Sequence, residues 1–140
     1  MIKIGMSGTR NGISKEALTE LRKFLSTNEI SEAHHGDCIG ADHDFHNEAK
    51  LYEIQIIIHP HNIDYMRSFC KGGTVRPAKP YLTRNRNIVD ETDILLAFPP
   101  TKQEIIRSGT WSTIRYAKRK NKKIFIIFPD GEVKKINYLP

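Results

Sequence analysis

Five short apolar runs, separated by helical patterns, most constrain what this chain can fold into. The runs lie at residues 2–6, 30–35, 54–60, 93–99 and 123–129. Three are nearly continuous in Ile, Leu and Phe, which is typical of parallel strands covered on both faces. Helical patterns lie at 14–26, 41–52, 83–91 and 108–120. This alternation predicts one α/β domain over residues 1–140: a single Rossmann-like domain whose open, mostly parallel five-stranded sheet carries helices on both faces.

The segment 60–82, with its glycines and prolines, is the one long connection in this pattern. A loop over the sheet edge and a short helix at 64–69 both fit its sequence, and a lid, a dimer contact and a plain connection are all open roles. The tail after the turn at Asp130-Gly131 has the pattern of a short edge strand.

Composition indicates an anionic partner and no membrane. The 140 residues carry a net charge of +6, which favours nucleotides, phosphates or nucleic acid. No apolar run approaches the roughly 20 residues of a membrane helix, and the N-terminus lacks a cleavage-site pattern. Cys38 and Cys70 lack zinc-type spacing, so we expect a cytoplasmic protein with free thiols. The run 115–123 holds six basic residues, and a solvated helix face is favoured there over a nucleic-acid contact.

Four unusual segments follow the predicted strands, at 7–12, 36–42, 59–62 and 99–110. Ligands of open α/β sheets bind at the carboxyl ends of strands, where these segments should converge. Small residues before a helix let N–H groups approach an anion. The predicted ligand-binding residues are Ser7, Gly8, Thr9, Arg10, Gly36, Asp37, Gly40, Asp42, His59, Arg84, Asn85, Ser108, Gly109, Thr110 and Trp111.

The stretch Ser108-Gly109-Thr110 both caps a helix and offers two hydroxyls and two N–H groups to a phosphate. We favour the phosphate role there, while in the segment 7–12 a tight turn and a phosphate loop are equally supported. Trp111 is open to two interpretations, base stacking and core packing. Arg84 and Arg86 lie two apart on a helix, so they point in different directions and one of them can reach the ligand.

Six histidines raise the question of a metal site. His43 and His46 are three apart on one helix and form half a site, but no further ligand follows at a fixed spacing. We therefore expect no metal and no cofactor. His34 or His35 is assigned to packing within the sheet, and His59 to the rim of the ligand site.

Taken in order, the segments "GMSGTR", "HHGDCIGAD", "IHP", "YLTRNRNIVDETDILLAFP", "RSGTWSTIRYA" and "KIFII" resemble the SLOG superfamily. That group joins the DNA-processing protein DprA, the LOG phosphoribohydrolases and the YspA/YpsA-like proteins, and the YspA-like branch is the most similar. The resemblance implies a Rossmann-like sheet with a pocket for a nucleotide-derived ligand. It assigns the role of the family's helix arginine to Arg84, which stands nine residues before Asp93. It aligns the family's phosphate loop with Ser108-Gly109-Thr110.

The sequence departs from the LOG pattern where that family has its catalytic glutamate, because Thr113 stands there. Cleavage of an N-glycosidic bond passes through an oxocarbenium-like centre that a carboxylate stabilises, and a threonine carries no such charge. Asp37, Asp42 or Glu104 would have to substitute from another loop. The candidate catalytic residues are therefore Asp37, Asp42 and Arg84.

Three functions follow in order of preference. The first is binding of a nucleotide or nucleotide-derived small ligand at the carboxyl edge of the sheet, as a sensor or sequestering module. The second is a nucleoside 5′-monophosphate N-glycosidase that uses a substitute carboxylate. The third is DprA-like binding of single-stranded DNA, which would use the net positive charge. A homo-oligomer is an open alternative.

Overall fold

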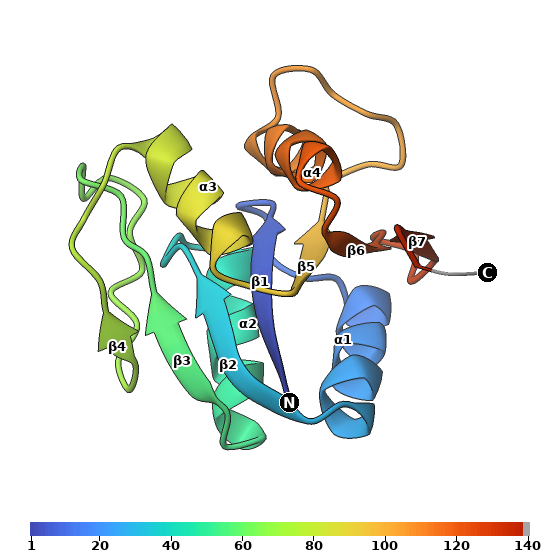
Figure 1. The fold of residues 1–140 in the computed structure, drawn as a ribbon, viewed down its shortest axis with the longest axis horizontal. Coiled ribbons are helices and arrows are strands. Elements are labelled where there is room, and N and C mark those ends of the chain that lie inside the picture. Colours follow the sequence, from blue (N-terminus) through green and yellow to red (C-terminus); the bar gives the residue numbers. More distant parts are fainter. Residues whose placement is uncertain (139–140) are drawn as a thin grey trace.

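A single seven-stranded sheet forms the centre of the computed structural model, which describes residues 1–138 (Figure 1). The strands are β1 (Ile2–Gly8), β2 (Ile30–His35), β3 (Gln55–Ile58), β4 (Thr74–Val75), β5 (Ile94–Phe98), β6 (Lys123–Ile127) and β7 (Val133–Ile136). Their order is β4-β3-β2-β1-β5-β6-β7. All neighbours pair in parallel except β6 and β7. The predicted class of fold, an open and mostly parallel Rossmann-like sheet, is confirmed.

The predicted count of five strands is wrong because each edge of the sheet carries one more. At one edge, β7 is the strand that the tail was predicted to add, and it begins just after the turn at Asp130-Gly131. At the other edge, β4 lies inside the long connection and pairs through two exposed residues only. An exposed edge strand has no reason to be apolar, so the hydrophobic pattern does not reveal it. No helix forms at 64–69.

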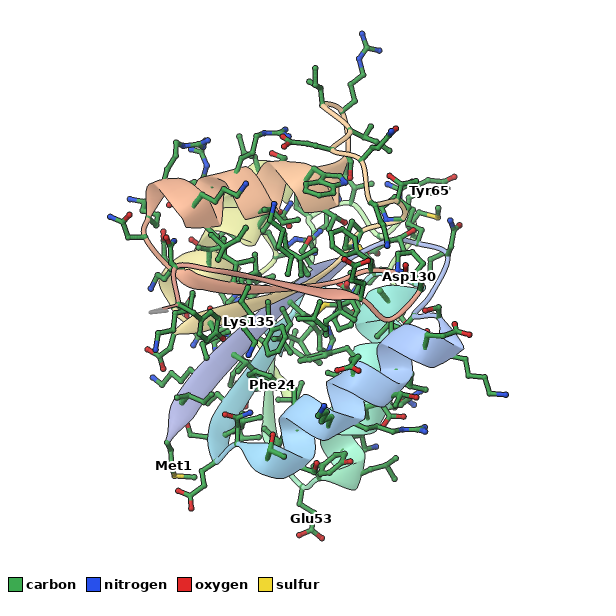
Figure 2. All side chains as sticks on the ribbon, turned by 90° about the vertical axis from the view of Figure 1, so that its right-hand side faces the viewer. Met1, Phe24, Glu53, Tyr65, Asp130 and Lys135 are labelled. Carbon is green, nitrogen blue, oxygen red and sulfur yellow. The ribbon has the colours of Figure 1, made fainter. Side chains whose placement is uncertain are left out.

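Two helices cover each face of the sheet. The helices are α1 (Lys15–Thr27), α2 (Ala41–Leu51), α3 (Tyr81–Asp90) and α4 (Gly109–Arg119). Figure 2 shows α4 on one side of the sheet and α1 on the other. Residues of α1 and α2 pack in one apolar core, and residues of α3 and α4 pack in a second on the opposite face. The predicted placement of helices on both faces is confirmed.

Local signals account for most helix boundaries. Ser14 caps α1 by accepting a hydrogen bond from the Ala17 N–H at 3.1 Å, so the helix begins within one residue of the predicted range 14–26. Helix α3 begins at Tyr81, directly after Pro80, because proline fixes a backbone angle compatible with a helix start. Among residues 1–138, no helix has both the length and the apolar character that crossing a membrane requires.

The order of the strands places the candidate site. Strand β1 lies between β2 and β5, so the chain reverses its direction of progress across the sheet at β1. The Thr9 N–H donates to the Phe98 carbonyl at 3.0 Å, which joins the carboxyl ends of β1 and β5. Ligands of such sheets bind outside the carboxyl ends of the strands near this reversal.

Candidate functional site

Arg84 is the most constrained residue at the carboxyl edge of the sheet. It lies on α3, and only 3% of it is exposed. Its Nη1 donates to the main-chain carbonyls of Gly36 and His59, which follow β2 and β3. Its Nε donates to Asn85 Oδ1 at 2.7 Å. Asn85 therefore orients the guanidinium, which gives a reason for a poor helix former at that position.

The second terminal nitrogen of Arg84 has no oxygen acceptor within residues 1–138. Nη2 has Cys38 Sγ at 3.7 Å, and sulfur is a weak acceptor. In the described part of the chain, no carboxylate oxygen lies within 4.0 Å of the guanidinium. The buried carboxylate of Asp42 acts on Arg84 through its charge but does not contact the guanidinium, so Nη2 keeps the capacity to bind a further anion.

Arg84 lines a pocket of about 290 Å³ at this edge of the sheet. Arg10 and Arg67 add two further guanidinium groups to its wall. His61, Tyr65 and Tyr81 add aromatic surface, and the Tyr81 ring centroid lies 5.2 Å from Arg84 Cζ. The pocket therefore combines positive charge for an anion with flat surfaces on which a ring can stack.

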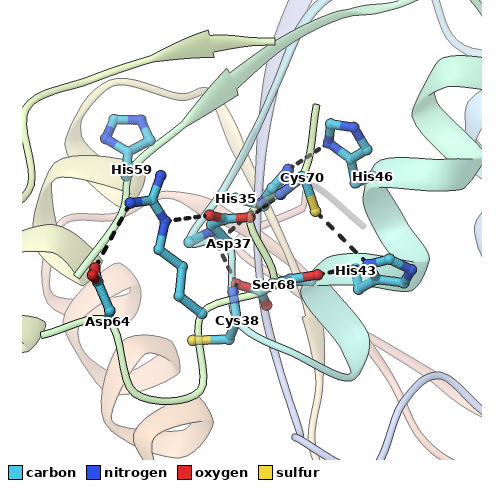
Figure 3. Close-up of polar contacts among 12 residues, drawn as sticks. His35, Asp37, Cys38, His43, His46, His59, Asp64, Ser68 and Cys70 are labelled. Atoms are coloured by element: carbon cyan, nitrogen blue, oxygen red, sulfur yellow. Dashed lines mark hydrogen bonds and ion pairs between the residues drawn. The ribbon is translucent and has the colours of Figure 1, made fainter. Parts of the chain in front are cut away.

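Asp37 attaches the segment 64–70 to the end of β2 (Figure 3). Its carboxylate accepts hydrogen bonds from Arg67 Nε at 2.7 Å and from the Cys70 N–H at 2.9 Å, and its carbonyl accepts one from the Ser68 N–H. Burial acts to raise the pKa of Asp37, but the bonds from Arg67 and Cys70 outweigh it and lower that pKa below its ordinary value. Asp37 is thus an ionised anchor that forms one wall of the pocket.

Asp42 shapes the turn that carries Asp37. Its Oδ2 accepts hydrogen bonds from the N–H groups of Gly36 at 3.0 Å and Cys38 at 3.2 Å. Burial raises the pKa of Asp42 to about 6. The carboxylate is turned toward its own loop and positions the Gly36 carbonyl that Arg84 uses.

The segment 7–12 at the end of β1 (here called the β1 loop) and the start of α2 lie together, as expected. A Cβ at Gly8 would lie 2.5 Å from the Ala41 Cβ, and one at Gly40 would lie 2.3 Å from the Arg10 carbonyl oxygen. The Ala41 N–H donates to the Thr9 carbonyl at 2.9 Å. Both glycines therefore allow a close approach that presents Arg10 at the pocket. Ser7 pairs with Ala97 inside the sheet.

A second cavity, of about 240 Å³, lies between the β1 loop and the end of β5. Thr9, Ser14, Pro99 and Pro129 are among the residues that line it, and none of its lining residues is charged. Its chemistry suits an anion less well than the Arg84 pocket does.

The start of α4 touches the Arg84 pocket through Tyr81. Ser108 caps the helix by accepting a hydrogen bond from the Trp111 N–H at 3.3 Å. A Cβ at Gly109 would lie 1.7 Å from the Tyr81 hydroxyl, so this glycine makes room for the tyrosine. The N–H groups of Gly109 and Thr110 occupy the first helical positions, where a helix leaves donors free. Tyr81 therefore lies against both Arg84 and this helix end.

The remaining residues near α4 are buried. Trp111 packs in the core beneath α4, and its indole N–H has no partner within residues 1–138. Thr113, which stands where LOG enzymes have their glutamate, donates its hydroxyl to the Gly109 carbonyl at 2.9 Å. Neither side chain lines the Arg84 pocket.

The histidines pair in ways that the spacing did not reveal. His59 offers its carbonyl to Arg84, while its ring contacts His34 and does not line the Arg84 pocket. His43 bonds Ser68, and His46 bonds His35, so the i, i+3 pair is divided between two partners.

Sequence reasoning missed the contribution of the long connection to the pocket. His61, Tyr65, Arg67 and Tyr81 all lie in the segment 60–82. Their signal was aromatic and basic residues just beyond the carboxyl end of a buried strand, which is where the chain meets a ligand in this architecture.

Fold and site together define a Rossmann-like α/β domain with an arginine-lined pocket at the carboxyl edge of its sheet. No protein-family model and no curated protein matches the chain. Solved structures do. The molybdenum cofactor binding protein of Rippkaea orientalis aligns with a TM-score of 0.68 and 18% identity, over 90% of this chain and 76% of that one. The structural-genomics target TM1055 aligns with a TM-score of 0.64 and 14% identity, over 89% and 72%.

DNA processing protein A (DprA) of Streptococcus pneumoniae aligns with a TM-score of 0.64 and 18% identity over 89% of this chain. The chain spans about half of that protein, 49%. DprA is a member of the superfamily that the sequence resembles, so the fold implied by the resemblance is confirmed. Assignment to the YspA-like branch stays a prediction.

Proposed function

We propose that the protein binds a nucleotide or nucleotide-derived small molecule at the carboxyl edge of its sheet, with the ligand's anionic group beside Arg84. The observation that carries this proposal is a buried guanidinium at the pocket wall whose Nη2 has, among residues 1–138, only the Cys38 thiol as a hydrogen-bond partner. A phosphate there would receive charge-assisted hydrogen bonds from Arg84 and from Arg10. The free N–H groups at the start of α4 lie just beyond Tyr81.

The size and lining of the pocket narrow the ligand class. About 290 Å³ is at the lower end of the range for small-molecule sites, which suits a mononucleotide or sugar phosphate. Tyr65, Tyr81 and His61 would stack against a base or cover a sugar. A neighbour of the same fold is named as a molybdenum cofactor binding protein, which supports binding of a small cofactor by this architecture.

Hydrolysis ranks below binding because each substitute carboxylate already has partners. Asp37 holds Arg67 and Cys70, Asp42 holds two N–H groups, and Glu104 pairs with Arg115 at 2.6 Å. A catalytic carboxylate must be free to face the sugar. Release of free base from a nucleotide panel, lost in Asp37→Asn or Asp42→Asn, would move the N-glycosidase hypothesis to first place.

Binding of single-stranded DNA ranks third. The basic run 115–123 is partly used inside the molecule: Arg115 bonds Glu104, Lys122 bonds the Thr92 carbonyl, and Arg119 lies over the Tyr116 ring. An oligonucleotide affinity that falls steeply with salt would support this mode.

The proposed ligand site is tested by calorimetry and thermal unfolding of the full chain with AMP, GMP, cyclic nucleotides, ADP-ribose and inorganic phosphate. A ligand at about 100 times its Kd should stabilise the protein by roughly 2.7 kcal/mol. Arg10→Gln should weaken binding without harming the fold, because Arg10 is exposed. Arg84→Gln should abolish binding.

Arg86→Gln is the matched control for these variants. Arg86 lies on the same helix, but its guanidinium lies over the Tyr116 ring, 5.1 Å from the centroid, and it does not line the Arg84 pocket. Binding should survive in this variant. Unchanged affinity in both Arg10→Gln and Arg84→Gln, or no response to any phosphate-bearing compound, would show that the site is wrong.

A further inference from the structure

Within residues 1–138, two clusters of metal-ligating side chains lie near the carboxyl ends of β2 and β3, and none of their side chains lines the pocket proposed for the nucleotide. One joins His34, His59 and Glu91, and the other joins His35, His46 and Cys70. Within each cluster, one potential ligand atom per residue lies within 4.8 Å of the others. The hydrogen-bond partners of each ring decide which nitrogen carries a proton, and therefore which of the two clusters has nitrogen lone pairs available to a metal.

In the His35 cluster the protons already occupy the positions that a metal would need. His46 Nε2 lies 2.7 Å from the Lys71 carbonyl, so it carries the proton and leaves Nδ1 as an acceptor. His35 Nδ1 accepts from the Asp37 N–H, so His35 Nε2 carries the proton that is donated to His46. His35 has no lone pair left for an ion, and the chain of hydrogen bonds is complete. This cluster is structural.

In the His34 cluster the partners leave lone pairs available. Glu32 Oε1 lies 2.8 Å from His34 Nε2 and accepts a hydrogen bond from its N–H, so His34 Nδ1 is unprotonated and carries a lone pair. That lone pair faces His59 Nε2 at 2.8 Å. The proton between the rings therefore belongs to His59. Moving it to His59 Nδ1 leaves two lone pairs that face each other, and a small turn of both rings directs them at one ion.

We propose that His34 Nδ1, His59 Nε2 and the Glu91 carboxylate bind one divalent transition-metal ion, for which Zn²⁺ and Co²⁺ are the probes. Two imidazoles and one carboxylate suit these ions and not Mg²⁺ or Ca²⁺, which prefer oxygen. Glu32 holds the other ring nitrogen of His34, as a carboxylate commonly does for a metal-bound histidine. The two nitrogens must separate from 2.8 Å to roughly 3.3 Å, because metal–nitrogen bonds of about 2.0–2.1 Å meet at a tetrahedral angle.

The surroundings supply both an open position and an opposing charge. His59 and Glu91 line a small cavity of about 100 Å³ together with Arg76, Lys79 and Arg84. Three protein ligands leave the fourth metal position facing this space. Arg76 Nη2 pairs with Glu91 at 2.9 Å, so the metal competes with Arg76 for the carboxylate. Removing Arg76 should strengthen metal binding.

The test is titration of the full chain with Co²⁺ and Zn²⁺ at neutral pH, by calorimetry and by the visible absorption of tetrahedral Co²⁺. We expect one ion per chain. Glu91→Gln, at a partly exposed position, should weaken binding about tenfold or more while leaving the fold intact. Arg76→Gln should tighten binding about fivefold, as expected for loss of a partly screened charge. His59→Gln should abolish binding.

His46→Gln is the matched control, since it removes a buried histidine from the structural cluster and should leave metal affinity unchanged. Three results would overturn the proposal: no uptake at millimolar Co²⁺, equal affinity in Glu91→Gln and the wild-type chain, or loss of binding in His46→Gln with retention in His59→Gln. A Co²⁺ spectrum without tetrahedral bands would overturn the assigned ligand geometry.

Discussion

The guanidinium of Arg84 packs so closely against Gly36 that no space is left for a side chain at position 36. Arg84 Nη1 donates to the Gly36 carbonyl, and a Cβ at position 36 would lie 2.2 Å from that same nitrogen. The guanidinium is thereby held at the end of β2 with its second nitrogen toward the pocket. This contact connects a glycine in a sheet loop with the charge that we propose binds the ligand.

Gly36→Ala should therefore displace Arg84. We expect a loss of roughly 1–3 kcal/mol in the free energy of unfolding, typical of overpacking at a buried site, together with weaker binding of phosphate compounds. Urea unfolding and calorimetry measure the two effects. In an Arg84→Ala background the same substitution should cost clearly less, because the clashing atoms are gone. Additive effects of the two changes would contradict the contact.

Asp37→Asn tests the attachment of the segment 64–70. Asp37 has a φ of 60°, and asparagine tolerates this left-handed conformation, so the variant removes mainly the charge. Weaker hydrogen bonds to Arg67 and Cys70 should cost roughly 1–3 kcal/mol. Amide hydrogen exchange should rise in 64–70 and stay unchanged in α1, which lies elsewhere in the fold. If amide protection in 64–70 is the same in the variant and in the wild-type chain, Asp37 does not anchor this segment.

Asp42 should make stability depend on pH in an unusual direction. Its pKa in the folded state is about 6, above the ordinary value near 3.9, so the folded chain binds the proton more tightly than the unfolded chain. The resulting stabilisation is fully present below about pH 4 and is lost as pH rises through about 6. It amounts to about 3 kcal/mol at most.

Asp42→Asn removes this titration and keeps an oxygen that accepts hydrogen bonds. Urea unfolding at several pH values between 4 and 8 should show that the wild-type chain loses stability relative to the variant as pH rises. If the difference in unfolding free energy between the two proteins stayed constant across this range, the pKa of Asp42 would not be raised in the folded state.

Gly109→Ala tests the contact between α4 and Tyr81. Alanine is the better helix former, so we expect any cost to come from the Tyr81 side chain, whose hydroxyl oxygen and Cζ would lie 1.7 Å and 2.9 Å from the new Cβ. Tyr81 is partly exposed and can turn aside, so we expect a loss of about 1 kcal/mol or less. Tyr81→Phe removes the oxygen that clashes most and leaves Cζ at 2.9 Å, so in that background Gly109→Ala should cost less than in the wild-type chain. A cost that phenylalanine leaves unchanged would contradict the contact with the hydroxyl.

Much of the fold could be predicted because the relevant signals are local. The buried strands β5 and β6 are continuous apolar runs, and α1 shows one apolar stripe behind a serine cap. Each pattern records which residues of one element meet the core, and this requires no knowledge of distant partners. The alternation of elements then places the loop ends, and with them Arg10 and Arg84, at one edge of the sheet.

Tertiary structure alone decided what those residues do. Arg67 contacts Asp37 from thirty positions away, and Tyr81 contacts Gly109 across two helices. Only packing sets which side chains meet at such separations, because periodicity describes one element at a time. The proton positions that distinguish His34 from His35 likewise depend on partners from β2, from α2 and from the segments that follow β2 and β3. The sequence by itself determined the class of fold and the edge of the sheet where we propose that a ligand binds, and the chemistry of that edge was decided by contacts between elements.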